Sequence, residues 1–516
     1  MVFSVPFSLH TCAMDSSYPP RFDHLYAISD LHLGGRQGFQ IFSQGERLAA
    51  TIGRLRHGIG DDQRLALVIN GDFVDFLAEH PHSCFNQRNA VEDLERVMAD
   101  PAFAPVFEAL AAFISRRRNH LVVTLGNHDL ELCLPPVRHA LLARLAGDDP
   151  AARSRIRLVA DGSGFRCRIG GAHVLLVHGN ATDPWNRIDA AGLLAAKAAC
   201  VSGRTPVDFP ANPGTRLVIE VLNGLKRSYP FVDLLKPEIP VVVAILHAVA
   251  GKKSRLTKWL WRLPEILAGP LDDKMAMACL SDRETPGVPQ QTRRALRELQ
   301  ELDRVFAGLA PEPDDNALLA AAWQQYVNEI SEGVPGEDDE ILLDLRLRKL
   351  RAWLPSWMDM VGSSEEKAES LRRTLNDVLR EDRSFSITGP DRIRENIADL
   401  AGDEINFLVA GHTHLCRSIG ISESRHYLNS GTWTDVLCFP ADLLQDRERF
   451  FKVFQAIGDG ADAAGLKKIE PAMIREEYTL AHIRAKNNGV RGELLQAARD
   501  GSLTDVSNST RFISTP

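Results

Sequence analysis

The chain has 516 residues, more than one hydrophobic core usually supports, so we expect a core domain with a large insertion or a second domain. Its 44% hydrophobic and 25% charged residues are ordinary for a soluble globular protein, and its net charge of -8 argues against a general nucleic-acid coat, which needs a basic surface. The eight cysteines include no C-x-x-C pair, which excludes an obvious disulfide framework or zinc knuckle.

The first residues of the chain do not combine a basic segment with a sustained apolar one, so we expect no signal peptide. No run reaches the roughly 18 consecutive apolar residues that a membrane-spanning helix needs. We therefore expect a cytoplasmic location, with contact at a membrane surface left open.

A recurrent pattern predicts the strands. In each case an apolar run rich in β-branched residues ends abruptly in a glycine or a polar cluster, which is typical of strands covered on both faces. Five segments have this pattern: 24–30, 65–71, 120–126, 173–179 and 405–411. Residues 425–433 and 477–484 resemble further strands, and the polar stretch from about Asn487 suggests a frayed tail.

Helical spacing lies between these strands. Residues 91–99 and 106–116 repeat apolar side chains at helical intervals, which gives an alternating β/α order. From 184 to 400 the pattern changes to long helical repeats, for example at 292–306 and 339–353. Because strand-like segments resume afterwards, we interpret 184–400 as a helical cap inserted into the core.

Each of the five predicted strands ends in groups that bind metals. In chain order the sequence reads D30-L-H32, G71-D72-F-V-D75, G126-N127-H128-D129, H178-G-N180 and G411-H412-T-H414. Polar side chains at the carboxyl ends of parallel strands meet in one crevice, and the spacing in Asp30-x-His32 and His412-x-His414 puts both side chains on one side of an extended chain. A single such motif is more often a solvated turn, but five in order predict a metal site.

The set resembles the signature of the calcineurin-like metallophosphoesterase superfamily. The resemblance covers residues 22–183 and 401–484, leaves 184–400 as the cap, and leaves 485–516 as a tail. It implies an α/β fold, a two-sheet metallophosphoesterase sandwich that here carries a large α-helical insertion. It also implies hydrolysis of a phosphodiester, pyrophosphate or phosphomonoester by attack of a metal-bound hydroxide.

The resemblance also implies a ligand for each position of a dinuclear centre. Asp30, His32 and His414 would hold one ion, Asn127, His178 and His412 would hold the other, and Asp72 would bridge the two ions. Mixed nitrogen and oxygen ligation suits Mn, Fe or Zn better than Ca. The cofactor expected is therefore a pair of divalent transition-metal ions.

Residues beside the ligands are assigned chemical roles. The resemblance makes His128 the group that stabilises the transition state or protonates the leaving oxygen, and Asp129 is predicted to orient and charge that imidazole. Asp75 is expected to brace the loop or a ligand histidine, or simply to cap a helix. The segment Asn429-Ser-Gly-Thr-Trp433 resembles a superfamily strand end and is expected to pack beneath the site.

The sequence resembles one branch more than others. I28-S-D-L-H-L-G-G35 together with GHTH is similar to the UDP-2,3-diacylglucosamine hydrolases, although His128 and Asn180 depart from their usual residues and the predicted cap is much larger. Asn180, Asp183 and Arg187 lead from a metal ligand into the cap and are candidates for substrate binding. A polar loop that starts a helix explains them equally well.

The cap contains an apolar run, 239–250, followed by the basic and Trp-containing segment 251–263. This pattern suits a peripheral membrane contact or capture of an anionic substrate. An ordinary core helix whose Lys and Arg residues face solvent explains it too. The expected partner is a phosphate-ester substrate, lipid-linked or nucleotide-like, and nucleic acid is not expected. A metal-dependent nuclease and an inactive binding scaffold remain alternative functions.

Overall fold

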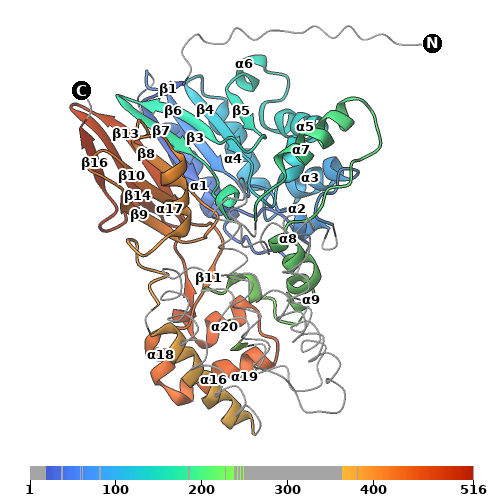
Figure 1. Ribbon diagram of the computed structural model, residues 1–516, viewed down its shortest axis with the longest axis vertical. Coiled ribbons are helices and arrows are strands. Elements are labelled where there is room, and N and C mark those ends of the chain that lie inside the picture. The colour runs from blue at the N-terminus through green and yellow to red at the C-terminus, as the bar shows by residue number, and fades with distance from the viewer. Residues whose placement is uncertain are drawn as a thin grey trace, which may run out of the picture.

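The computed structural model describes residues 19–236 and 363–514, apart from residues 37–38, 59, 61, 81–82, 184–185, 227 and 381, together with residues 241, 244, 245 and 248. Two main β-sheets, with helices on their outer faces, build the larger body of the described chain. A smaller helical body lies beyond one end of the sheets (Figure 1).

All seven strands expected from the sequence are present in the structure. They are β2 (His24–Ile28), β3 (Leu65–Asn70), β4 (Asn119–Thr124), β7 (Ala172–Leu176), β8 (Phe407–Ala410), β10 (His426–Ser430) and β13 (Thr479–Lys486). The remaining strands are β1 (Arg21–Phe22), β5 (Ile156–Val159), β6 (Phe165–Ile169), β9 (Cys416–Gly420), β11 (Val436–Leu437), β12 (Ile474–Arg475), β14 (Gly489–Ala497), β15 (Leu503–Asp505) and β16 (Arg511–Ser514).

The larger sheet has the strand order β15-β14-β13-β2-β3-β4-β5, and β16 also pairs with β14. Its strands β2 to β5 are parallel, whereas β13 runs antiparallel to β2. The smaller sheet has the order β1-β6-β7-β8-β10-β9, with β7, β8 and β10 parallel. Because parallel strands end at the same edge, each sheet brings several of the predicted motifs together.

Alternating side chains of each central strand enter two different cores. Leu25 and Ala27 of β2 lie in the core between the sheets, and Tyr26 and Ile28 pack under the helices on the outer face. The helices on this face include α1 (Gly45–His57), α3 (Ala90–Ala99), α4 (Ala104–Ile114), α5 (Pro135–Ala146) and α7 (Ala190–Val201). The helices α3 and α4 confirm the predicted β/α order. Both faces of the strand are covered, which explains why its sequence is apolar almost throughout.

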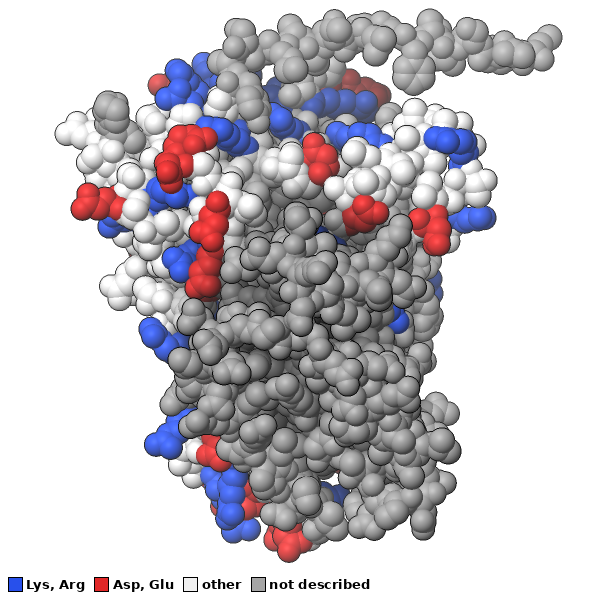
Figure 2. Space-filling view, viewed as in Figure 1, with Lys and Arg blue, Asp and Glu red and all other residues white. Residues whose placement is uncertain are grey.

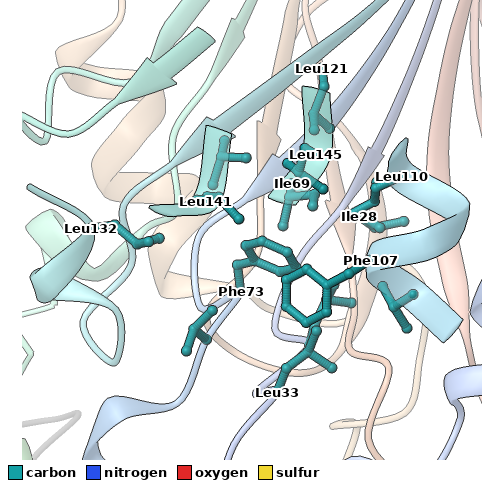
Figure 3. Close-up of a cluster of buried hydrophobic side chains, with 14 of the residues drawn as sticks. Ile28, Leu33, Ile69, Phe73, Phe107, Leu110, Leu121, Leu132, Leu141 and Leu145 are labelled. Atoms are coloured by element: carbon teal, nitrogen blue, oxygen red, sulfur yellow. The ribbon is translucent and has the colours of Figure 1, made fainter. Parts of the chain in front are cut away.

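The outer core also anchors the loops that follow the strands. Phe73, which comes directly after Asp72, is fully buried and packs on Phe107 of α4 with ring centroids 5.5 Å apart (Figure 3). Leu33, three residues after Asp30, lies in the same cluster. The polar residues at the strand ends are therefore held by buried apolar neighbours.

Short helices complete the sheet region. They are α2 (Phe76–Glu79), η1 (Leu130–Cys133), α6 (Pro150–Arg153) and η2 (Asn180–Thr182). Helix α17 (Arg392–Leu400) covers the smaller sheet, because Ile393 and Ile397 pack with Leu408 and Tyr427.

The helical body has a hydrophobic core of its own. Its helices come from three separated parts of the chain: α8 (Pro213–Leu217), η3 (Val218–Leu222), α9 (Asn223–Lys226), η4 (Val232–Leu234), α16 (Ser364–Leu379), α18 (Ala441–Gln445), α19 (Arg447–Gly458), α20 (Ala463–Ile469) and η5 (Pro471–Met473). The sequence predicts that 401–484 belongs to the sandwich. Within this range, 436–474 contribute to the hydrophobic core of the helical body.

The large helical insertion itself stays a prediction. Residues 249–362 lie outside the described residues, and with them the expected helices at 292–306 and 339–353 and the basic segment 251–263. Among the described residues, no single helix is long and apolar enough to cross a membrane, although the bent pair α3 and α4 passes the same test of length and composition.

The C-terminal region differs from the frayed tail expected from the sequence. Strand β14 pairs with β13 along eight residues and also with β15 and β16. Val490 and Leu494 of β14 are fully buried in the core between the sheets. The prediction was wrong because charged residues along β14 obscured its inward-facing apolar side chains.

Candidate metal centre

The predicted ligands all follow strands whose carboxyl ends lie close together. Asp30 and His32 come after β2, Asp72 after β3 and Asn127 after β4 of the larger sheet. His178 comes after β7, and His412 and His414 after β8, of the smaller sheet. The candidate site thus spans the two sheets at one end of the sandwich.

Three overlapping groups of side chains lie close enough to hold a metal ion, with ligand atoms within 4.8 Å of one another. The groups are Asp30, His32 and His414; His32, Asp72 and His128; and Asp30, Asp72 and His178. Asp72 joins the second and third groups. Asp30 and His32 are each shared by two groups in the same way, so the three groups form one continuous cluster.

His412 and Asn127 adjoin these groups. The backbone N–H of His412 donates to Asp30 Oδ2 at 2.9 Å, and the imidazole of His412 stands edge-on to that of His178 with centroids 5.3 Å apart. Asn127 is buried directly before His128, whose backbone N–H donates to Asp72 at 2.9 Å. The structure therefore brings six of the predicted ligands together and places Asn127 directly beside His128 of the same cluster.

Several buried atoms at this site lack the partners that buried polar atoms normally have. Asn127 Oδ1 is buried and forms no hydrogen bond, and the buried His178 Nε2 lies 3.2 Å from Asp72 Oδ2 without the geometry of a hydrogen bond. His32 Nε2 and His414 Nε2 face each other at 3.1 Å, and two neutral imidazole nitrogens can share such a gap only if one of them carries a proton. Carboxylate, imidazole and amide donors that converge in this way fit divalent transition-metal ions.

The backbone at the ligands adopts a conformation that non-glycine residues rarely adopt. Positive φ occurs at Asp30 (54°), His32 (50°), Asp72 (50°), His412 (70°) and His414 (60°). Asn508 is the only other non-glycine residue with positive φ in the described part of the chain. Left-handed backbone of this kind is concentrated at functional sites, where the surrounding structure enforces it.

Glycines precede the ligands because neighbouring ligands occupy the space of a side chain. A Cβ at Gly126 would lie 2.0 Å from Asp72 Oδ1, and a Cβ at Gly411 would lie 2.5 Å from Asp30 Oδ2. Both distances are shorter than any real contact, so even alanine would displace a carboxylate. The G-D, G-N and G-H pairs of the sequence thus reflect close packing of ligands on backbone.

Burial and charge act in opposite directions on the ionisable groups. Burial alone would raise the pKa of Asp30, but the imidazoles of His178 and His414 outweigh it and lower the pKa to about 2. Burial opposes the charged form of His178, whereas the carboxylates of Asp72 and Asp30 raise its pKa to about 10. Burial lowers the pKa of His414 to about 4. The ionised carboxylates therefore favour a positive charge beside them, which a bound cation would supply.

The partner of His128 differs from the one expected. Asp129 was predicted to orient this imidazole, but its carboxylate accepts the backbone N–H groups of Phe73 at 2.9 Å and Gly126 at 2.7 Å. His128 Nδ1 instead lies 3.1 Å from Asp75 Oδ1. The role assigned to Asp129 is therefore corrected: it braces the loops around Asp72 and Asn127, because both of its oxygens are used by the backbone.

Asp75 combines the two roles that the sequence left open. Its side chain accepts the backbone N–H of Ala78 at 3.0 Å as the N-cap of α2, and its other oxygen lies 3.3 Å from His32 Nδ1. Burial would raise its pKa, but the imidazoles of His128 and His32 hold the pKa well below the usual range. One ionised carboxylate thus fixes two imidazoles of the site.

The three candidate substrate residues mainly contact their own loop. Asn180 Nδ2 donates to the carbonyl of Asn186 at 3.2 Å, and Arg187 Nε donates to the carbonyl of Ala181 at 3.1 Å. Asp183 differs from both, because its Oδ2 lies 2.8 Å from His412 Nε2. Substrate binding by these residues stays a prediction.

The segment Asn429–Trp433 packs beneath the site, as its sequence suggested. Asn429 Nδ2 donates to the carbonyl of Gly411 at 2.8 Å, and Thr432 Oγ1 donates to the carbonyl of Asp30 at 2.9 Å. Trp433 is fully buried, and its indole N–H donates to the carbonyl of Thr479. These bonds connect the loops of the two sheets.

Comparison with known families agrees with this geometry. Residues 24–215 match the family model described as calcineurin-like phosphoesterase. A search of curated proteins found no match. The family match gives no support for the narrower resemblance to UDP-2,3-diacylglucosamine hydrolases.

The chain thus carries a calcineurin-like phosphoesterase domain over residues 24–215, with buried Asp and His groups that could hold metal. Together these findings indicate a metal-dependent phosphoesterase. Of the predicted ligands, five lie within the matched range, and His412 and His414 lie beyond it. The five are Asp30, His32, Asp72, Asn127 and His178.

Proposed function

We propose that this protein hydrolyses a phosphodiester, pyrophosphate or phosphomonoester with two divalent transition-metal ions, Mn, Fe or Zn, held by the seven predicted ligands. The observation that carries the proposal is the set of overlapping Asp and His groups, in which Asp30, His32 and Asp72 are each shared by two groups. Bound ions of this kind activate a water for attack at phosphorus and offset the charge of the phosphoryl oxygens.

The residues of the site would divide between two ions by position. Asp30, His32 and His414 form one compact group, and His178 lies beside Asp72 with His178 Nε2 3.2 Å from Asp72 Oδ2. Asn127 Oδ1, which lacks a partner, would complete the second set. Two buried carboxylates supply negative charge, and neutral imidazole and amide groups fill the other positions.

We assign His128 to the substrate, although it also belongs to one of the three groups that could hold an ion. Its side chain is 17% exposed, more than those of Asp72 or His178, and Asp75 holds Nδ1 so that Nε2 is directed away from this carboxylate. A histidine that is positioned in this way can donate a proton to the leaving oxygen.

The non-phosphate part of the substrate would contact an apolar cavity beside the site. This cavity of about 240 Å³ is lined by apolar side chains that include Leu125, Val159 and Ile397, and His178 and Asn180 also line it. An apolar cavity that adjoins ionisable groups is the usual form of a small-molecule site. It favours a lipid-linked or otherwise apolar alcohol over a nucleotide.

The surface gives little support for nucleic acid as a substrate. On the face shown in Figure 2, the described Lys and Arg side chains are interspersed with Asp and Glu, and the net charge of the whole chain is -8. A groove that tracks a nucleic-acid backbone needs a continuous basic surface. A cytoplasmic location, with or without peripheral membrane contact, remains part of the proposal.

The test is hydrolysis by purified protein with Mn²⁺, Fe²⁺ or Zn²⁺ added after treatment with a chelator. The substrates are phosphate mono- and diesters of short and long alkyl alcohols, a dinucleotide pyrophosphate and a single-stranded oligonucleotide. We expect metal-dependent turnover, with the lowest KM for long alkyl esters. Turnover of the oligonucleotide alone would establish the nuclease instead, and no turnover with any metal would contradict the proposal.

A further inference from the structure

The imidazole of His412 is held by a carboxylate from a different part of the chain. His412 Nε2 lies 2.8 Å from Asp183 Oδ2, although the two residues are 229 positions apart in the sequence. A carboxylate accepts hydrogen bonds, so Nε2 carries the proton and the lone pair of the neutral imidazole lies on Nδ1. In the described part of the chain, His412 Nδ1 forms no hydrogen bond.

Two other imidazoles of the site, those of His32 and His178, have the opposite arrangement. His32 Nδ1 lies 3.3 Å from Asp75 Oδ2, and His178 Nδ1 donates to the carbonyl of Asn70 at 2.8 Å. Both residues therefore direct Nε2 toward Asp72, at 3.7 Å from His32 and 3.2 Å from His178. An outer acceptor thus fixes the tautomer of each ring, and His412 alone among the three is fixed through Nε2.

Asp183 is itself held in place before any ligand binds. Asn186 Nδ2 donates to Asp183 Oδ2 at 2.7 Å, and the backbone N–H of Asp183 donates to the carbonyl of Asn180 at 3.1 Å. The preceding residue, Thr182, accepts a hydrogen bond from Asn396 of α17 at 3.0 Å. The loop after η2 is therefore connected to the helix that covers the smaller sheet.

We propose that Asp183 is a positioning residue that directs His412 Nδ1 toward the second metal ion, rather than a substrate-binding residue. This inference rests on the proposed metal centre. A carboxylate that hydrogen-bonds one nitrogen of a ligand histidine fixes the ring and makes the other nitrogen a stronger electron-pair donor to the metal. Loss of such a carboxylate typically costs about 10- to 100-fold in metal affinity. The loop that leads toward the helical body would thereby set the occupancy of one ion.

The experiment compares Asp183→Ala, Asp183→Asn and Asp189→Ala with the wild-type protein, each stripped of metal and titrated with Mn²⁺ or Zn²⁺ in a calorimeter. Asp189 is the matched control, because it is an exposed carboxylate of the same loop that makes no capping hydrogen bond at α7. Asn at position 183 keeps an oxygen that can accept the His412 N–H but removes the charge.

We expect Asp183→Ala to weaken the second binding event about 10- to 100-fold and to leave the first unchanged. Asp183→Asn should recover part of this loss, and Asp189→Ala should behave as wild type. Unchanged affinity in Asp183→Ala, or weakening of both events to the same degree, would overturn the inference. Failure of the wild-type protein to bind two ions would instead contradict the proposed metal centre.

Discussion

Single residues at the candidate metal centre combine an unfavourable backbone conformation with unusually close packing. Left-handed φ at a non-glycine residue costs about 1–3 kcal/mol and persists only where other contacts enforce it. At Asp30 these contacts are explicit, because its carbonyl accepts the Thr432 hydroxyl at 2.9 Å and its own N–H donates to the carbonyl of Gly71 at 3.2 Å. The sequence motif is therefore also a packing motif.

Replacement of Gly126 by alanine tests this close packing. We expect Gly126→Ala to lose metal, because the new Cβ would lie 2.0 Å from Asp72 Oδ1 and would displace the shared carboxylate. Gly53→Ala in α1 is the control, since a Cβ there meets no atom within 4 Å. Elemental analysis of both purified variants measures the effect, and a fully loaded Gly126→Ala protein would show that Asp72 can move without loss of metal.

A second pair of substitutions separates metal binding from proton transfer. Asp72→Asn should abolish turnover through loss of metal, because Asp72 belongs to two of the three potential metal groups. His128→Ala should retain metal and lose roughly 10² to 10⁴ in kcat, the range for a general acid or base. Metal analysis together with steady-state kinetics distinguishes the two effects. Equal metal loss in both variants would make His128 a ligand.

The residues of the site were largely predictable from sequence because each one follows a recognisable strand. The role of Asp129 was not predictable, because two carboxylates lie near His128. Asp129 follows it directly in the sequence, whereas Asp75 comes from the loop after the neighbouring strand. Only the fold decides which carboxylate contacts the imidazole. In the structure both oxygens of Asp129 accept hydrogen bonds from the backbone N–H groups of Phe73 and Gly126. The Asp183–His412 contact joins residues 229 positions apart and had no local signal.

Among the elements, central strands were easier to predict than the strands near the C-terminus. Strand β14 contains Arg491 and Glu493, and its polar sequence suggested a frayed tail. In the structure Glu493 is buried, but it lies 3.2 Å from His482 of β13 and also pairs with Arg491. Cross-strand partners therefore let charged residues occupy a sheet, and no local pattern can reveal them.

Truncation tests the structural role of β14. Removal of residues 487–516 should give insoluble or unfolded protein, because β13 would lose its partner along eight residues and the core between the sheets would lose Val490 and Leu494. Removal of 511–516 alone, which takes away only β16, should be much milder. Circular dichroism and thermal melting measure both. If the protein without β14 still folds, the C-terminal region would have no structural role, as the prediction of a frayed tail implied.

Acid sensitivity of the smaller sheet provides another test. Burial and the charge of Arg511 lower the pKa of His426 on β10 to about 4. Its pKa in the unfolded chain is higher, so the unfolded state gains the proton first and the folded state loses up to about 3 kcal/mol between pH 6.5 and 4. His426→Gln should therefore show a smaller drop in melting temperature over this range, in chelator to exclude metal effects. An identical drop would contradict the assignment.

At the scale of the whole molecule, the helical body lies close to the metal centre. The positive charge of Lys226 in α9 acts to lower the pKa of His128, and that of Lys236 acts to lower the pKa of His414. The backbone N–H of Lys236 donates to the carbonyl of Leu437 at 2.9 Å. Leu235 also forms a β-bridge with Leu437. Sequence periodicity predicted helices here, but it could not reveal that 436–474 join them, because that contact depends on long-range packing.

The most direct test of the account is the location of metal in the folded protein. A crystal structure with anomalous scattering data should contain two ions in each chain, one among Asp30, His32 and His414 and one among Asn127, His178 and His412, with Asp72 between them. A single ion, or ions bound elsewhere while these side chains remain free of metal, would contradict a dinuclear phosphoesterase centre.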